Sequence, residues 1–373
     1  MKPPILFVIL QSGPLANGGL ESITQVMQRL EHFRPVVVTN AETGLSRRWR
    51  QSGTEIHIVP EHASAGLRRR PAAALLTYVR YHRSIRRLLR ATGAQIVHAN
   101  DPLAFQLSLS AATLSGSRLV LNLRDTLDPQ RAPPRLKFRI LFGAADHVLY
   151  LSQDMAERWL EVAPNAAAHC TVTYSIVDPE AFAPSEPPAM QPVVLLSGVF
   201  RRKKGQLDFI RKVVPVLAER SIQTWFAGDF EPATNAYAAQ CAAAAEQWRD
   251  HVRFLGYCPD MAALYARASV IAVPSRHEGL MRGMIEAMSC GRPVVSFDIC
   301  SARELLEEKS GGAGTVVPSG DHDAMARELI RYATDAAARD AAGAKGVAAA
   351  HELFDPARVS GRHESAYRAL GRD

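Results

Sequence analysis

The chain has 373 residues, of which 47% are hydrophobic and 22% are charged. That length is too great for one ordinary hydrophobic core, so we expect a soluble protein of two domains. The apolar runs at 3–10 and 192–196 are much shorter than the roughly 20 residues that span a bilayer, and we expect no transmembrane helix. The first run also lacks the length and the cleavage site of a signal peptide, which indicates a core strand instead.

The net charge of +7 is unevenly distributed along the chain. Residues 1–185 hold 21 basic and 14 acidic side chains, whereas residues 186–373 hold 23 of each. This asymmetry predicts an anionic partner for the first half, which could be a membrane surface, a phosphorylated acceptor or a nucleic acid. The five cysteines are scattered without metal-ligand spacing, so we expect buried free thiols in a reducing cytosol.

Short apolar segments alternate with longer amphipathic ones, which predicts parallel, doubly wound α/β sheets. A proline-rich run at 182–192 interrupts this alternation, because proline continues neither a helix nor a central strand. Before it we expect strands at 5–10, 36–39, 56–59, 96–98, 119–123 and 147–151. After it we expect strands at 193–197, 223–227, 252–254, 270–273, 293–297 and 314–317.

The sequence thus predicts two Rossmann-like domains in tandem, residues 1–185 and 186–352, joined by the proline-rich run. Ligands of open parallel sheets bind beyond the carboxyl ends of the strands, so the expected site is a cleft between the domains. The alanine-rich stretch 336–350 has high helix propensity and predicts a surface helix.

The segment 274–295 is the most informative part of the sequence. It leaves an expected strand, passes through a glycine-containing loop, and enters a short helix that Gly291 and Pro293 end. The N-terminus of such a helix offers unpaired N–H groups to a diphosphate. Glu278 in the loop and Glu286 in the helix are too far apart to form one acid–base pair, but each can bind hydroxyls of an extended ligand. The alternative is that Glu278 caps the helix and that Glu286 is a solvated helix residue.

Four segments together resemble the GT-B glycosyltransferases of family 4, which are retaining enzymes that use nucleotide sugars. They are the block 278–286 with its Pro-Ser and Gly-Arg-Pro-Val flanks, and the segments 197–205, 252–257 and 266–275. The resemblance covers nearly the whole chain and implies two Rossmann-like domains that face a cleft. It also implies a closing helix at 353–371 that packs back on the first domain.

The resemblance assigns Glu278 to the hydroxyls of the donor sugar and Glu286 to the ribose of the nucleotide. Glycines in the expected site let the backbone approach the donor closely, because they have no Cβ. The predicted donor-binding residues are Gly18, Gly19, Arg201, Arg202, Lys204, Gly256, Tyr257, Glu278, Gly279, Leu280, Met281, Gly283, Met284 and Glu286.

The expected phosphate loop departs from the family pattern. Lys204 matches the lysine that neutralises the leaving diphosphate, but the family's arginine is missing because Val199 stands in its place. Arg201 or Arg202 is the expected replacement. The alternative interpretation is that this run is a solvated basic loop.

In the first half, the expected strands at 96–98 and 119–123 end at the same cleft. His98 is the candidate catalytic histidine, and its alternative is a structural role in the core. Asn100 and Arg124 are candidates for the acceptor side, and Arg124 stands where the family often has a histidine.

The implied reaction is sugar transfer with retention of configuration, in polysaccharide, lipopolysaccharide or other glycoconjugate biosynthesis. The leaving diphosphate helps to deprotonate the acceptor hydroxyl, and Glu278, Lys204 and His98 are the expected catalytic residues. UDP or GDP is the expected carrier of the sugar. We expect no cofactor and no metal, because the sequence shows no acidic cluster and GT-B enzymes as a class do without one.

Residues 67–90 contain eight arginines and no acidic residue, interleaved with apolar side chains. A basic amphipathic helix of this kind can lie on anionic lipid headgroups, and the alternative is an ordinary surface helix. We therefore expect a cytoplasmic protein on the inner face of the membrane, with a glycan or lipid-linked acceptor.

Two other function classes fit part of the pattern. A UDP-sugar 2-epimerase shares the paired domains, but the block 278–286 and the Lys204-Gly205 pair favour transfer. A nucleic-acid-binding protein would use the basic first half, but no recognisable binding module is present, and we expect no nucleic acid partner.

Overall fold

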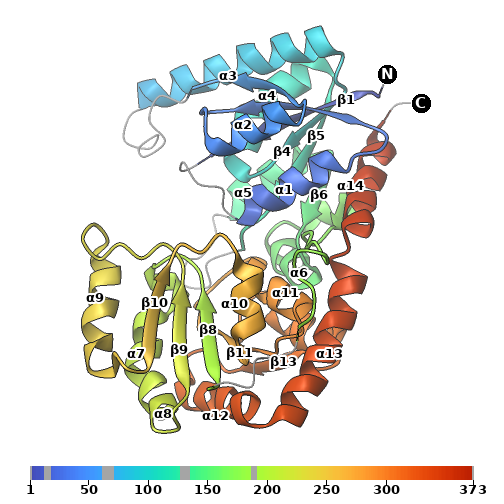
Figure 1. Cartoon of the computed structure of the whole chain (residues 1–373). Coiled ribbons are helices and arrows are strands. Elements are labelled where there is room, and N and C mark those ends of the chain that lie inside the picture. Colours follow the sequence, from blue (N-terminus) through green and yellow to red (C-terminus); the bar gives the residue numbers. More distant parts are fainter. Residues whose placement is uncertain (1, 12–17, 61–70, 127–134, 186–190, 372–373) are drawn as a thin grey trace. The chain divides into compact units, whose positions relative to one another are not determined.

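The computed structural model describes residues 2–11, 18–60, 71–126, 135–185 and 191–371. The chain forms two compact units, residues 1–176 with 356–373 and residues 177–355 (Figure 1). Each unit contains one parallel sheet, which confirms the predicted α/β class with two Rossmann-like domains. The predicted boundary at 185 is too late, because the chain enters the second unit at Val177.

The first unit has a seven-stranded parallel sheet in the order β3-β2-β1-β4-β5-β6-β7. All six strands predicted for this half are present, and β1 is buried throughout most of its length, as its unbroken apolar run requires. The short edge strand β7 was missed, since three residues give no alternation to detect. The bounds are β1 (Pro4–Ile9), β2 (Arg34–Thr39), β3 (Glu55–Ile58), β4 (Ile96–Ala99), β5 (Arg118–Leu123), β6 (His147–Tyr150) and β7 (Cys170–Val172).

The helices of this unit begin and end at recognisable signals. Asp101 caps α4 by accepting hydrogen bonds from two backbone N–H groups, and Gly116 ends it in the left-handed conformation. No helix in the described part of the chain is both long and apolar enough to cross a membrane. The bounds are α1 (Gly18–Gln28), α2 (Gly44–Gln51), α3 (Pro71–Thr92), α4 (Pro102–Ser115), α5 (Arg135–Gly143), α6 (Gln153–Val162), the 3₁₀ turn η1 (Pro164–His169) and α14 (Pro356–Leu370). The last of these, α14, belongs to the first unit and contacts α1.

The second unit has a six-stranded parallel sheet in the order β10-β9-β8-β11-β12-β13, and all six strands were predicted. The chain moves outward from β8 to β9 and β10, then returns to β11 on the other side of β8. The loops that follow β8 and β11 therefore leave neighbouring strands at the point where the strand order reverses. The bounds are β8 (Val193–Ser197), β9 (Gln223–Ala227), β10 (Val252–Gly256), β11 (Val270–Val273), β12 (Val294–Phe297) and β13 (Gly314–Val317).

Helices and short turns connect these strands or follow the last of them. They are η2 (Arg202–Lys204), α7 (Gln206–Lys212), α8 (Val214–Ala218), α9 (Ala236–Ala245), η3 (Glu246–Trp248), α10 (Met261–Arg267), α11 (Arg282–Ser289), η4 (Glu304–Lys309), α12 (His322–Thr334) and α13 (Ala336–Leu353). The block 278–286, which contains Glu278 and Glu286, spans the loop after β11 and the helix α11.

The alanine-rich helix α13 is present, but the prediction that it is only a surface feature is wrong. Its small residues form a buried stripe that lies against the C-terminal end of α11. A Cβ on Gly343 would collide with the carbonyl oxygen of Gly291, and a Cβ on Gly346 would come within 3.2 Å of the carbonyl oxygen of Met288. The close approach of two backbones therefore holds α11 in place.

Alanine substitutions at two helical glycines should change the free energy of unfolding in opposite directions, because only one of the glycines lies in this contact. Gly361→Ala in α14 has open space, so it should raise the free energy of unfolding by roughly 0.5–1 kcal/mol through helix propensity. Gly343→Ala should lower it by about 1–3 kcal/mol, because the new methyl group meets backbone. Urea unfolding followed by circular dichroism measures both, and a stabilised Gly343→Ala variant would show that the two helices do not pack this closely.

Candidate functional site

The loops that follow β8 and β11 pack directly against each other. The backbone N–H of Arg276 donates to the carbonyl oxygen of Lys203 over 2.7 Å. Gly205 adopts the left-handed conformation, with φ of 76°, and any Cβ there would collide with the carbonyl oxygen of Pro274. Glycine at 205 is thus required by both conformation and space.

The packing of these loops brings a lysine and a glutamate together. The Nζ of Lys204 lies 3.0 Å from Oε1 of Glu278, whose residue surface is only 8% exposed. The Nζ of Lys203 lies 4.0 Å from the other carboxylate oxygen, Oε2. Gly198 leaves room for this arrangement, since a Cβ there would come within 3.3 Å of the Lys204 side chain. Two of the predicted site residues, Glu278 and Lys204, therefore form a half-enclosed ion pair.

The second predicted glutamate is a buried residue of α11. Glu286 pairs with Arg282 through one carboxylate oxygen and accepts a hydrogen bond of 3.1 Å from the Tyr265 hydroxyl through the other. Burial raises the pKa of Glu286, and the charge of Arg282 opposes that effect. The alternative of a solvated helix residue is therefore wrong for Glu286, and Tyr265 is a neighbour that the sequence did not reveal.

The N-terminus of α11 opens toward the same loops. Its N-cap residue, Met281, makes no side-chain cap hydrogen bond to the N–H groups of the first turn. Gly283 lies against the hydroxyl oxygen of Ser197 at the end of β8, where a Cβ would collide. Ser301 donates to the carbonyl oxygen of Gly279 over 3.1 Å and so helps to fix the loop. An uncapped N-terminus beside a lysine pair is suited to an anion.

The remaining predicted residues of the second unit are more dispersed. Leu280 is half-buried in the loop, and Met284 is a core residue of α11. Gly256 and Tyr257 lie at the carboxyl end of β10, two strands from β8 in the sheet, where the Tyr257 side chain is exposed. These positions share the carboxyl-terminal edge of the sheet with the lysine–glutamate pair.

The structure does not bring the predicted replacement arginines to the ion pair. Arg202 has its guanidinium carbon 6.0 Å from the centre of the Tyr237 ring, on the side of α9. Arg201 is exposed at the start of the turn η2. The cation that joins Lys204 at Glu278 is Lys203, which no feature of the sequence distinguishes from its basic neighbours.

His98 lies in the core of the first unit, so the prediction of a cleft histidine is wrong. Its residue surface is 0% exposed, its Nδ1 lies 2.9 Å from the Tyr367 hydroxyl, and its Nε2 lies 3.3 Å from Nδ2 of Asn122. Burial lowers the pKa of His98 well below its ordinary value, helped by the charges of His363 and Arg124. Asn122 donates to Nε2, so the neutral ring carries its proton on Nδ1 and donates it to Tyr367. This is the structural alternative considered for His98.

The other predicted residues of the first unit surround this polar core. Asn100 is buried, and its Oδ1 accepts a hydrogen bond of 3.2 Å from Asn122. Arg124 is half-buried and close enough to His98 for its charge to act on that ring. Gly18 and Gly19 form the first turn of α1, while the loop before them, residues 12–17, lies outside the described residues.

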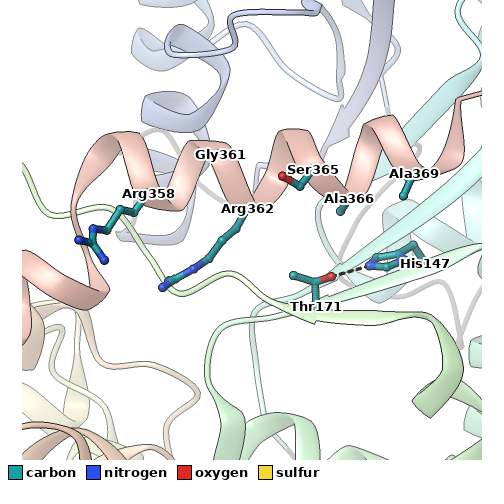
Figure 2. A pocket seen from close by; sticks show the side chains of 8 residues that line it. All are labelled: His147, Thr171, Arg358, Gly361, Arg362, Ser365, Ala366 and Ala369. Carbon is teal, nitrogen blue, oxygen red and sulfur yellow. Dashed lines mark hydrogen bonds between the residues drawn. The ribbon is translucent and has the colours of Figure 1, made fainter.

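A hollow of about 540 Å³ in the first unit contains none of the predicted site residues. It lies between α14 and the strands β6 and β7, with His147 hydrogen-bonded to Thr171 on one side (Figure 2). Two arginines and several small residues of α14 complete it. The lining residues are His147, Thr171, Arg358, Gly361, Arg362, Ser365, Ala366 and Ala369.

Among the described residues, Glu31, His32 and Glu364 are close enough together to share a metal ion. Glu364 accepts hydrogen bonds from the backbone N–H of His32 over 2.7 Å and from its ring Nδ1 over 2.9 Å. These contacts connect α14 with the segment between α1 and β2. We assign this group a structural role.

Two family models match the chain, one in each unit. The model described as "Glycosyltransferase Family 4" matches residues 20–181, and the model described as "Glycosyl transferases group 1" matches residues 191–335. The chain belongs to glycosyltransferase family 4. This membership confirms the predicted family and favours transfer over the epimerase and nucleic-acid alternatives.

Several curated relatives of this family are similar over part of their length. The O-antigen chain mannosyltransferase B of Escherichia coli is 40% identical over 104 residues, which are 27% of this chain and 26% of the relative. The lipopolysaccharide core biosynthesis mannosyltransferase LpcC of Rhizobium leguminosarum bv. viciae is 31% identical over 143 residues, 38% of this chain and 40% of the relative. The matched segments thus span less than half of either relative.

Solved structures match the whole chain at low sequence identity. The Anabaena protein HepE in complex with UDP has a TM-score of 0.81 at 20% identity and covers 99% of this chain and 100% of its own. A glycosyltransferase from Rickettsia africae ESF-5 has a TM-score of 0.81 at 17% identity, with 99% and 98% covered. At such identities the likeness establishes the fold, which is the predicted GT-B arrangement of two Rossmann-like domains.

The buried histidines predict acid sensitivity of the first unit. Burial lowers the pKa of His363 to about 4 and that of His98 well below 6.5, so between these values the unfolded chain binds more protons than the folded one. The stability of the unit should be full above about pH 6.5 and fall as the pH drops toward 4. Hydrogen exchange in β1, β4 and α14 at pH 7.5 and 5, corrected for intrinsic rates, measures this change.

A matched pair of variants separates the histidine contribution from general acid effects. His363→Gln should reduce the loss of protection at pH 5, whereas His351→Gln at an exposed position should not. Equal protection at both pH values in the wild-type protein would contradict the neutral, buried state of these rings.

Proposed function

We propose that the protein is a retaining glycosyltransferase that moves a sugar from a UDP- or GDP-linked donor to an acceptor hydroxyl of a lipopolysaccharide-type glycoconjugate. The observation that carries this proposal is the Lys204–Glu278 ion pair beside the uncapped N-terminus of α11. The relatives named as O-antigen and lipopolysaccharide core mannosyltransferases support the acceptor class. The HepE complex with UDP supports a nucleotide donor.

Positively polarised groups in this site would bind the diphosphate of the donor, and carboxylates would bind its hydroxyls. Its diphosphate would accept hydrogen bonds from the first-turn N–H groups of α11 and would attract the ammonium group of Lys204. When Lys204 turns to the phosphate, the carboxylate of Glu278 becomes available to accept hydrogen bonds from sugar hydroxyls. Glu286, already oriented by Arg282 and Tyr265, would bind the ribose hydroxyls.

In the proposed reaction the bond between the anomeric carbon and the phosphate oxygen breaks as the bond to the acceptor oxygen forms on the same face. The acceptor proton passes to the leaving phosphate oxygen, so no enzyme nucleophile is needed. Lys204 and the α11 N-terminus would stabilise the negative charge that develops on the diphosphate. Because protein groups supply this charge, we propose that transfer needs neither a cofactor nor a metal ion.

Substitutions of the ion pair test this function. Glu278→Gln and Lys204→Met should each lower kcat/KM by about 100-fold, because each removes a charge at the reacting centre. Lys212→Met, at an exposed lysine of the same unit, should leave transfer unchanged. A panel of UDP- and GDP-sugars with glycan and lipid-linked acceptors, assayed with and without EDTA, provides the measurement.

The same assay can reject the proposal. Wild-type turnover by Glu278→Gln, or no transfer from any nucleotide sugar, would contradict the function. Loss of activity with EDTA that added Mg²⁺ restores would contradict the metal-free mechanism alone.

We also propose that α3 brings the protein to an anionic membrane, on the cytoplasmic face where its free cysteines stay reduced. Leu75 and Leu76 are 63% and 60% exposed near the start of α3, whereas Tyr81 and Ile85 in its second half are buried in the core. The arginines at 80, 83, 87 and 90 are exposed. Apolar side chains at one end and cations along the helix suit an anionic bilayer surface. The start of the predicted segment, residues 67–70, lies outside the described residues.

The double variant Leu75→Glu with Leu76→Glu should abolish binding to vesicles that contain anionic lipid, because it removes the inserted side chains and adds repulsion. Leu114→Glu in α4 is the matched control, since Leu114 is also 63% exposed. Vesicle flotation at low salt measures both variants. Equal flotation of the double variant and the wild type would contradict the role of α3.

A further inference from the structure

The proposed donor site lacks a cation at one position where the family resemblance leads us to expect an arginine. A nucleotide sugar carries two phosphate charges, and a third develops as the sugar leaves. The position where an arginine is expected holds Val199, an uncharged and 42% exposed side chain. We infer that Lys203 supplies the missing cation and makes the site selective for nucleoside diphosphates over monophosphates. This inference rests on the proposed function.

The geometry of Glu278 carries the inference. Two consecutive lysines approach its two oxygens, Lys204 at 3.0 Å from Oε1 and Lys203 at 4.0 Å from Oε2. The Lys203 side chain is 31% exposed, compared with 14% for Lys204, so it retains the freedom to turn toward a ligand. Both ammonium groups therefore already face the region where the loops after β8 and β11 meet.

The backbone of Lys203 is held by its neighbours. Its carbonyl oxygen accepts the N–H of Arg276 over 2.7 Å, and the guanidinium of Arg276 pairs with Asp208 at 3.0 Å. Lys203 also lies inside the 3₁₀ turn η2, which Gly205 ends in the left-handed conformation. Only the side chain of Lys203 has to move to reach a phosphate.

Three other cations of this region, Arg202, Arg276 and Arg282, have different partners, and Arg201 is exposed at the start of the turn η2. Arg202 lies toward the ring of Tyr237, and Arg276 is occupied by Asp208. Arg282 neutralises the buried carboxylate of Glu286. Lys203 is thus the cation beside Lys204 whose present partner, Glu278, is itself a predicted donor-binding residue.

Because Lys203 and Lys204 share the carboxylate of Glu278, recognition of the donor's diphosphate is linked to recognition of its sugar. While Lys203 and Lys204 face Glu278, they screen its charge; a diphosphate carries more negative charge and competes for both lysines. Each lysine that turns to the phosphates leaves a carboxylate oxygen free for a sugar hydroxyl. Binding of the diphosphate therefore prepares Glu278 for the sugar.

Calorimetric titration of the full-length protein with UDP, GDP, UMP and GMP tests this assignment. Lys203→Ala should weaken binding of the preferred diphosphate by about tenfold and change affinity for the matching monophosphate less than about twofold. Arg202→Ala, in the same turn, is the matched control and should change neither affinity. Adding Val199→Arg to Lys203→Ala should restore part of the diphosphate affinity, because it returns a cation to the expected position.

The outcomes distinguish this inference from the function on which it rests. If Lys204→Ala weakens diphosphate binding but Lys203→Ala does not, or if Lys203→Ala weakens mono- and diphosphate binding equally, the role of Lys203 is wrong and the function stands. If the wild-type protein binds no nucleoside diphosphate, both are wrong. Circular dichroism of each variant confirms that the side chain, not the fold, was changed.

Discussion

The contact between the loops after β8 and β11 is the constraint on which the rest of the site depends. These strands are neighbours because the chain reverses its direction across the sheet, so two segments distant in sequence meet at one edge. Gly205 makes the meeting possible, since any side chain there would strike the carbonyl of Pro274. The lysine–glutamate pair exists only because these two backbones touch.

The two glutamates of the site are kept in different states by their surroundings. Glu286 is buried, with its pKa raised by desolvation, and it keeps its orientation through Arg282 and Tyr265. Glu278 faces two lysines, which in the proposed function turn from it to the phosphate. A buried, oriented carboxylate suits a constant part of a ligand, such as a ribose, whereas a carboxylate with mobile partners suits a part that changes during the reaction.

The sequence predicted the fold well, because unbroken apolar runs mark strands buried on both faces. It also pointed to Glu278 and Glu286, because the block that contains them resembles the family 4 glycosyltransferases. It could not identify Lys203, which differs from its basic neighbours only in where the turn η2 directs it. It misassigned His98 because the sequence does not show which distant residue packs over a strand end. That residue is Tyr367, which comes from the far end of the chain.

The position of His98 bears on how the acceptor hydroxyl loses its proton. A neutral ring with both nitrogens hydrogen-bonded in the core cannot reach a substrate, so the proposed base is the leaving phosphate oxygen. Cations around that phosphate have opposing effects, because they stabilise its departure but lower its affinity for the proton. In the proposed reaction, two lysines on flexible side chains, rather than a rigid arginine fork, would shift between Glu278 and the phosphate as charge develops. In the proposed function, the substitution at Val199 and the lysine pair would thus be two parts of one adjustment to the same leaving group.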